Sequence, residues 1–391
     1  MKKQIKKRAL LLVTLLIAVI GATYVFQENF CHPGNFFDED RLTFFHNEPE
    51  DSMDIVVMGS SDVYAGYSAA TAYRDFGITS YPYALSGATV TSWKGMLEDI
   101  LETQNPKLIV LEPFGACYDN SVVRERNSQA IKLLDTIPFS AHKIRLAQDL
   151  ATRVEGTKTI DFLFPFIKYH NTYGAYVRNF KVHREIRKMK TSPLKGVSNV
   201  TRISAPAKTY DARQDTRVLE LDTDSEKCLR EFFDYAKSRG VNIVVARFPQ
   251  VLAEEGEDQH RSLLRANRVG EIAEEYGYPF INMQYRWDDI GLDTYHDFYN
   301  RAHLNIYGQQ KVTDYICDYL IKDCGLEVSP KSDNVKSNWE EALRYYKTYV
   351  SYTEDCLAND KTEELGDSPD VVRKLKKYME EHPDIIEGTQ Q

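Results

Sequence analysis

The stretch Asp54-Ile-Val-Val-Met-Gly-Ser-Ser-Asp-Val-Tyr64 decides the fold that we expect for this chain. Its β-branched and aliphatic run ends abruptly in Gly-Ser-Ser, which is typical of a buried strand that delivers a serine into a turn at its carboxyl end. Similar apolar runs recur downstream, and most are preceded or followed by helix-like stretches. The expected strands are Ile55–Met58, Tyr81–Leu85, Leu108–Leu111, Ile243–Ala246 and Phe280–Ile281, and the expected helices include Trp93–Thr103, Ser225–Ser238 and Ala266–Tyr276.

Apolar strands that alternate with helices predict an α/β fold, in which a parallel sheet is covered by helices on both faces. We therefore expect a three-layer domain over residues 54–325. Reactive groups in such sheets lie beyond the carboxyl ends of the strands. Ser61, Gly87 and Gly115 all fall shortly after apolar runs, where this rule expects a site.

The alternation of strands and helices fails between residues 118 and 218, a stretch rich in lysine, arginine and aromatic residues. A structureless loop of that length would be unusual, so we expect a helical insertion in the main domain. Its basic and aromatic side chains suit contact with anionic headgroups or polymer, or equally the surface of an ordinary solvated subdomain. We expect residues 27–53 to form an irregular lead segment and residues 326–391 to form a helical C-terminal extension.

The amino terminus joins a basic segment to an apolar one. Residues 1–8 contain five basic residues and no acid, whereas residues 9–26 are uncharged and largely aliphatic. Such a run is at the short end of what crosses a hydrocarbon core of about 30 Å. We expect a retained single-pass membrane anchor, with the basic tail cytoplasmic and the main domain outside the cell membrane. A signal peptide cleaved at Gly21-Ala22 is the alternative.

The composition argues against a nucleic-acid partner. The formal net charge is −9, whereas nucleic-acid binding needs a basic face. The six cysteines are too widely spread for a zinc ribbon, and the sequence carries no motif for a metal or a nucleotide cofactor. Outside the cytoplasm some cysteines are able to form disulfides, although we expect Cys117, after an apolar strand, to be a buried free thiol.

A second informative stretch, Phe298-Tyr-Asn-Arg-Ala-His-Leu-Asn-Ile-Tyr-Gly308, carries a histidine just before a predicted helix. A serine hydroxyl is a poor nucleophile until a positioned imidazole takes its proton, so acyl chemistry requires both residue types. Ser61 is therefore the candidate nucleophile and His303 the candidate general base. The alternative for Ser61 is a role in capping the following helix, which is compatible with catalysis.

At these two stretches the chain resembles the SGNH (GDSL-like) hydrolase superfamily, and within it the membrane-anchored members that work beside membrane-bound O-acyltransferases in bacterial cell-surface polymer modification. The family's first block, Gly-Asp-Ser-x, corresponds to Gly59-Ser60-Ser61-Asp62, and its last block, Asp-x-x-His, corresponds to Asn300-Arg301-Ala302-His303. The resemblance covers about residues 50–325 and implies a flavodoxin-like sheet. The third block, Gly-x-Asn-Asp, is absent, which is similar to the anchored acyl-transfer relatives.

The resemblance leaves the third member of a catalytic triad open. Asn300 stands where the family has its acid, and an amide oxygen orients an imidazole but does little to stabilise its charged form. Asp297, three residues earlier, is an equal candidate for that role. Asp293 and His296 are more remote candidates.

The resemblance also implies an oxyanion hole made of backbone N–H groups near Ser61 and Gly87. Gly87 matches the glycine of the family's second block, and a plain turn after the strand is its alternative role. In place of the missing third block the chain reads Glu112-Pro-Phe-Gly-Ala-Cys-Tyr-Asp-Asn120, from which Gly115 or Asn120 would stand in.

The function that the resemblance implies is acyl transfer through a serine ester, with acetyl as the expected group and D-alanyl as the alternative. A multipass membrane-bound O-acyltransferase would supply the acyl group, and a hydroxyl of a cell-surface polysaccharide or teichoic acid would receive it. Two other hypotheses remain open. One is an esterase acting on the same polymers, and the other is a non-catalytic glycan-binding or scaffold subunit. The lipid bilayer is the expected partner of residues 9–26.

Overall fold

The computed structural model describes residues 2–30, 36–119, 127–153, 157–164, 180–181, 184–186, 188–189 and 191–387. The chain divides into two compact units, one of residues 1–36 with 138–189 and the other of residues 37–137 with 190–391. The second unit contains all of the predicted strands and both informative stretches.

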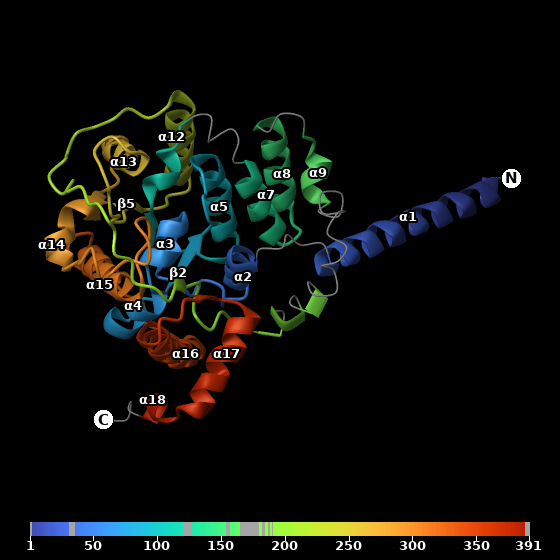
Figure 1. The fold of residues 1–391 in the computed structure, drawn as a ribbon. Helices are drawn as coiled ribbons and strands as arrows, with labels where there is room; N and C mark the ends of the chain where they lie inside the picture. The colour runs from blue at the N-terminus through green and yellow to red at the C-terminus, as the bar shows by residue number, and fades with distance from the viewer. Residues whose placement is uncertain are drawn as a thin grey trace. The chain divides into compact units, whose positions relative to one another are not determined.

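The larger unit is built on a five-stranded parallel sheet (Figure 1). Counted along the chain, its strands are ordered 2-1-3-4-5, which is the order of flavodoxin-like sheets. The first four strands are buried along their whole length, which explains why apolar residues dominate their sequences. The strands are β1 (Ile55–Gly59), β2 (Ser80–Ala84), β3 (Leu108–Leu111), β5 (Ile243–Arg247) and β6 (Phe280–Asn282).

Helices cover this sheet in two groups, which lie on either side of the strands in Figure 1. In one group α5 (Val90–Thr103) packs on α12 (Thr223–Ser238), while α13 (Asp258–Glu275) contacts β5 and β6. In the other, α3 (Ser61–Gly66) and α4 (Ala69–Phe76) each contact both β2 and α15. The predicted α/β class with a parallel sheet is therefore confirmed. Other elements of the unit are α2 (Phe36–Phe45), η1 (Pro113–Ala116), α7 (Asn127–Thr136), η3 (Met283–Arg286), α14 (Trp287–Ile290) and α15 (Ile306–Lys322).

The C-terminal segment packs into the same unit. Helix α16 (Asp333–Ala358) contacts α4 and α17 (Pro369–Glu381), and α18 (Asp384–Glu387) follows. Strand β4 (Ser198–Val200) pairs antiparallel with β7 (Glu364–Gly366). The C-terminal helices thereby share a buried cluster with the start of α15 and with the residues that precede β4. Its members include Leu194, Val197, Ile306, Tyr346, Tyr349, Leu365 and Leu375.

The smaller unit contains the N-terminal helix α1 (Lys2–Phe30) together with α8 (Ala141–Arg153) and α9 (Thr159–Leu163). Helix α1 is long and apolar enough to cross a membrane over Lys3–Phe26, a description that a retained anchor and a signal sequence both meet. Helices α8 and α9 contact each other. Residues 165–179, the most aromatic part of the expected insertion, lie outside the described residues.

The cysteines within the described residues are all free thiols. Cys117 is buried, as its place after an apolar strand predicted, and burial raises the pKa of its thiol to about 12. Cys31 lies outside the described residues. The free thiols are Cys117, Cys228, Cys317, Cys324 and Cys356.

A fully buried ion pair within the larger unit joins Glu48 to Lys195. The Lys195 ammonium lies 2.7 Å from the Glu48 carboxylate, and neither side chain is accessible to solvent. Lys195 also donates to the amide oxygen of Asn338 in α16 and lies over the Trp339 ring. Because a buried charge is costly without its partner, this pair constrains three segments that are distant in the sequence.

We expect the substitution Glu48→Gln to lower the free energy of unfolding by about 3 kcal/mol, because it leaves the Lys195 ammonium buried and unpaired. The double variant Glu48→Gln with Lys195→Met removes both charges and should recover most of this loss. Urea unfolding of the full chain measures both values. Glu231→Gln, in the exposed pair with Lys227, is the control and should change stability by less than about 0.5 kcal/mol. If Glu48→Gln and the control Glu231→Gln lowered the free energy of unfolding equally, the expectation would be contradicted.

Candidate active site

Strand β1 ends at Gly59, where only glycine fits. A Cβ at this position would lie 2.6 Å from the Cβ of Glu112 and 2.9 Å from the side chain of Val63. Because real Cβ atoms do not approach each other so closely, the glycine lets the end of β1 pass directly against the residue that follows β3. The chain then turns into α3, and Ser61 is the first residue of that helix.

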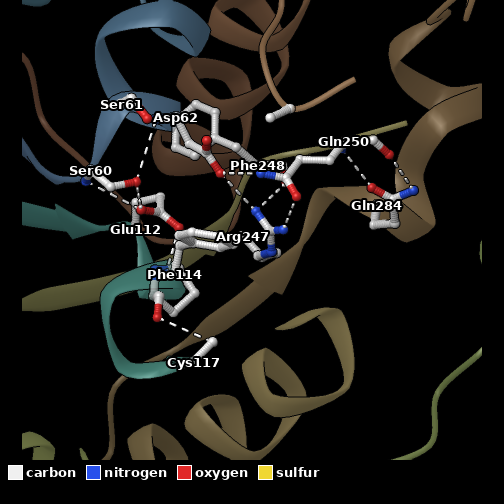
Figure 2. A network of polar contacts seen from close by, with 12 residues as sticks. Ser60, Ser61, Asp62, Glu112, Phe114, Cys117, Arg247, Phe248, Gln250 and Gln284 are labelled. Carbon is white, nitrogen blue, oxygen red and sulfur yellow. Dashed lines mark hydrogen bonds and ion pairs between the residues drawn. The ribbon is translucent and has the colours of Figure 1, made fainter. Parts of the chain in front are cut away.

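The two adjacent serines have different surroundings (Figure 2). Ser60 is buried and caps α3, and its hydroxyl lies 2.8 Å from the Glu112 carboxylate. Ser61 is only partly buried, and its Oγ lies 2.8 Å from Nε2 of His303. Ser61 is thus the serine that meets the imidazole, although 242 positions separate the two residues.

A short hairpin holds the histidine in place. Phe298 and Leu304 form an antiparallel bridge, and the Tyr299 N–H donates to the carbonyl of His303 at 3.1 Å. The Tyr299 ring stacks nearly parallel on the imidazole, with an interplanar angle of 8°. The bridge, the backbone hydrogen bond and the stacked ring together hold the imidazole in a fixed orientation toward Ser61.

Asn300 determines which imidazole nitrogen carries the proton. Its Oδ1 accepts hydrogen bonds from the backbone N–H groups of Ala302 and His303, both at 2.8 Å, and lies 3.1 Å from Nδ1 of His303. An oxygen that already accepts two N–H donors is an acceptor for Nδ1 as well, so Nδ1 carries the hydrogen. Nε2 is then free to accept the proton of Ser61, which is the tautomer that a general base requires.

Burial keeps the imidazole neutral. It lowers the pKa of His303 from its ordinary value of 6.5 to about 4, because the charged form loses hydration. The amide of Asn300 provides no charge to offset this effect. The nearest carboxylate oxygen is Oδ1 of Asp62, 3.8 Å from Nε2.

Asp297 has a different environment from the one a triad acid would have. Its side chain is fully buried and accepts from the backbone N–H of Asp293, from the ring of His296 and from the Lys311 ammonium. Lys311 lies at 2.7 Å, so the charge of Asp297 is already paired. Asn300, and neither Asp297 nor His296, is the residue that the structure brings to Nδ1 of His303.

Gly87 and Gly115, two of the residues expected to form an oxyanion hole, have different surroundings. Gly87 adopts a left-handed conformation (φ +64°) in the turn after β2, and a hydrogen bond from Leu85 to Gly59 joins this strand end to that of β1. Within the described residues, the N–H groups of Ser61 and Gly87 donate to no other group. Gly115 instead packs tightly, since a Cβ there would lie 2.6 Å from the Ala88 carbonyl.

Asn120, the remaining candidate for the oxyanion hole, lies outside the described residues.

A buried polar network extends from Asp62 across the end of the sheet (Figure 2). Oδ2 of Asp62 accepts from the Arg247 guanidinium at 3.0 Å and from the Gln250 amide at 2.8 Å. Arg247 also donates to the Gln250 amide oxygen, and the backbone N–H of Gln250 donates to Gln284. These residues follow or end β1, β5 and β6, so the network joins three strand ends.

Glu112 adds a second buried carboxyl group to the network. It accepts from Ser60 and from the backbone N–H of Phe114, which lies under the Arg247 guanidinium. Burial first, and then the negative charge of Asp62, raises the pKa of Glu112. Burial also raises the pKa of Asp62, although Arg247 acts in the opposite direction. Arg247 bonds directly to Asp62, so it stabilises the charged form of that carboxyl group, while burial and the neighbouring charge both disfavour the charged form of Glu112.

Sequence reasoning gave no role to Asp62, Glu112, Arg247 or Gln250. A signal was nevertheless present, because Glu112 and Arg247 are charged residues that directly continue fully apolar strands. A charge at such a place must be paired or neutralised in the interior.

No group of three or more histidine, cysteine or acidic side chains within the described residues is arranged to hold a metal ion. Comparisons of the chain with family models, with curated proteins and with solved structures found no match.

We expect the substitution Asn300→Asp to raise the pKa of His303 by about one to three units, because it puts a carboxylate beside Nδ1 with little change in shape. NMR titration of imidazole resonances in the full chain measures the shift, with His303→Gln used for assignment. Asn105→Asp adds the same charge at the amino ends of the strands and should leave the titration unchanged. An unaltered pKa in Asn300→Asp would show that Asn300 does not contact the ring.

We expect Glu112→Gln to gain stability relative to the native protein as pH rises from 4.5, the ordinary pKa of a glutamate, to about 7, the raised pKa of Glu112 in the folded protein, and to keep that gain at higher pH. The folded-state pKa of Glu112 is raised, so its stabilising contribution is present at low pH and is lost as pH rises through that pKa. Glutamine does not titrate and escapes this loss, which is at most about 1.4 kcal/mol per pH unit. Urea unfolding at acidic and alkaline pH measures the difference. Glu340→Gln, at an exposed position, should show no such trend.

Proposed function

We propose that this protein is a membrane-anchored serine acyltransferase of the SGNH type, which adds acyl groups, expected to be acetyl, to a polysaccharide or teichoic acid outside the cell membrane. The observation that carries the proposal is the 2.8 Å approach of Ser61 Oγ to Nε2 of a neutral imidazole whose Nδ1 is fixed by Asn300. The site lies at the carboxyl end of a central strand in a parallel sheet, where α/β enzymes bind their ligands.

In the first half of the reaction Ser61 Oγ attacks the carbonyl carbon of an acyl donor while its proton moves to Nε2 of His303. The negative charge that develops on the carbonyl oxygen would be met by the N–H groups of Ser61 and Gly87. Collapse of the tetrahedral intermediate breaks the bond to the donor's leaving oxygen, which takes the proton from Nε2. An acyl ester of Ser61 remains.

In the second half a sugar hydroxyl gives its proton to Nε2 and attacks the serine ester. The acyl group passes to the sugar oxygen, and Ser61 recovers its proton from Nε2. Water in place of the sugar would give an esterase by the same steps. The absence of the family's Gly-x-Asn-Asp block favours transfer, because the resemblance associates that loss with the anchored acyl-transfer members.

The apolar helix α1 supports the proposed location, because it would hold the larger unit beside a membrane-bound O-acyltransferase that supplies the acyl donor. With the N-terminal basic tail cytoplasmic, the larger unit would face the cell-surface polymers.

We expect the full chain in micelles to form an acyl-enzyme on Ser61 when it is given an activated acetyl ester, and to transfer the group to an added oligosaccharide. Ser61→Ala and His303→Gln should each lower the rate by about 10⁴-fold. Because burial lowers the pKa of His303 to about 4, the acylation rate should stay constant from neutral pH down to about pH 5. Intact-mass spectrometry and detection of acetylated sugar measure the two steps.

Ser238→Ala, at an exposed serine outside the site, is the matched control and should react like the native protein. Release of free acetate without acetylated sugar would replace the transferase by an esterase. If no acyl adduct forms on Ser61, or if surface acylation in cells persists in Ser61→Ala, the proposal is wrong and the non-catalytic alternative is favoured.

A further inference from the structure

A cavity of about 620 Å³ opens at the same edge of the sheet as Ser61 and has no part in the chemistry described above. Its volume lies within the range of roughly 300–1,000 Å³ that is usual for small-molecule sites. Residues that follow β5 and β6 line it, among them Gln250 and Gln284. Aromatic and charged side chains complete the wall.

Three aromatic residues face this cavity, namely Tyr210, Trp287 and Tyr295. Tyr295 is 58% exposed, so most of its ring is open to solvent and available to a ligand. Trp287 is stacked on Phe298 with an interplanar angle of 14°, so its position is fixed from behind. Trp287 itself is largely buried, so Tyr295 is the exposed ring of the three. A ring with an apolar face and a polar edge suits a ligand that is itself apolar on one face and polar at its rim, as a sugar ring is.

The charged residues of the cavity leave an excess of negative charge. Three aspartates line it with one arginine, and Arg213 is already bonded to Asp211 and to Asp288, at 2.7 Å in each case. Asp293 is the third aspartate, and its carboxylate accepts the backbone N–H of Tyr295. Carboxylates in this arrangement accept hydrogen bonds from hydroxyl groups and repel anions.

Two contacts connect the cavity to the catalytic residues. Gln250 lines the cavity and also donates to Asp62, the neighbour of Ser61. Val251, another lining residue, donates its N–H to the carbonyl of Arg301 in the histidine hairpin. Since Gln250 stands between the cavity and Asp62, a ligand in the cavity would be a neighbour of the reacting group, as adjacent units of one polymer are.

We propose that this cavity is a subsite for a sugar unit that carries no negative charge, belonging to the polymer whose adjacent unit is acylated at Ser61. The proposal rests on the proposed function for the role of the sugar as acceptor, but the binding itself does not depend on catalysis. It selects an uncharged or amino-bearing polysaccharide over an anionic polymer such as a teichoic acid or a polyuronate.

The test is binding of tetrasaccharides to the full chain, kept in a detergent without a sugar headgroup so that the detergent cannot compete. N-acetylglucosamine and glucose tetramers serve as uncharged probes, and a galacturonate tetramer serves as the anionic probe. Saturation-transfer NMR and calorimetry should show binding of an uncharged tetramer and none of the anionic one. Tyr295→Ala should weaken that binding by roughly tenfold, and Asp288→Asn should weaken it by several-fold.

Both substitutions change exposed side chains, so the variants should fold, which a thermal unfolding curve checks. Asp370→Asn changes an equally exposed aspartate that is also paired with an arginine, and should bind as the native protein does. Ser61→Ala should also bind normally, so loss of acyl transfer and loss of sugar binding are separate results. Binding of no uncharged tetramer at millimolar concentration, preference for the anionic one, or indifference to Tyr295 and Asp288 would each overturn the subsite.

Discussion

The guanidinium of Arg247 is the only described cation within hydrogen-bond reach of a buried cluster that contains two carboxyl groups, Asp62 and Glu112. These three residues come from the ends of different strands, so none of them could be buried without the sheet that brings them together. The glycine at the end of β1 permits the contact with Glu112, and Ser60 bonds to it. The residues next to Ser61 are therefore held by a buried polar network, and this network fixes the orientation of Ser61 toward His303.

An amide at Asn300 in place of a carboxylate changes the electrostatics of the histidine more than its geometry. Asn300 fixes the hydrogen on Nδ1 through an oxygen that is itself held by two backbone N–H groups. What it lacks is the negative charge that would stabilise the imidazolium. As a proposed base, His303 would therefore be well oriented but weak, and Asp62, at 3.8 Å from Nε2, would be the carboxyl group beside it when the imidazole is protonated.

The parts of this structure that sequence could predict are those determined by local pattern. The five strands were predictable because each contains a short, mainly apolar run near helix-like segments, and the first of them leads directly to Ser61. The choice between Asn300 and Asp297, three and six positions before His303, was not predictable, because only the hairpin decides which one reaches the ring. The pairing of Glu112 with its neighbours depends on strand order, which no short segment encodes.

The distance along the chain between the proposed nucleophile and its proposed base has a consequence for synthesis. Ribosomes make proteins from the amino end, and 242 residues separate the serine from the histidine. The two side chains can meet only after the segment that carries the histidine has been made, and the hairpin must then dock beside the first strand. If the pair is catalytic, the hydroxyl of a growing chain stays unactivated until that docking, so the order of assembly itself delays any reaction with esters.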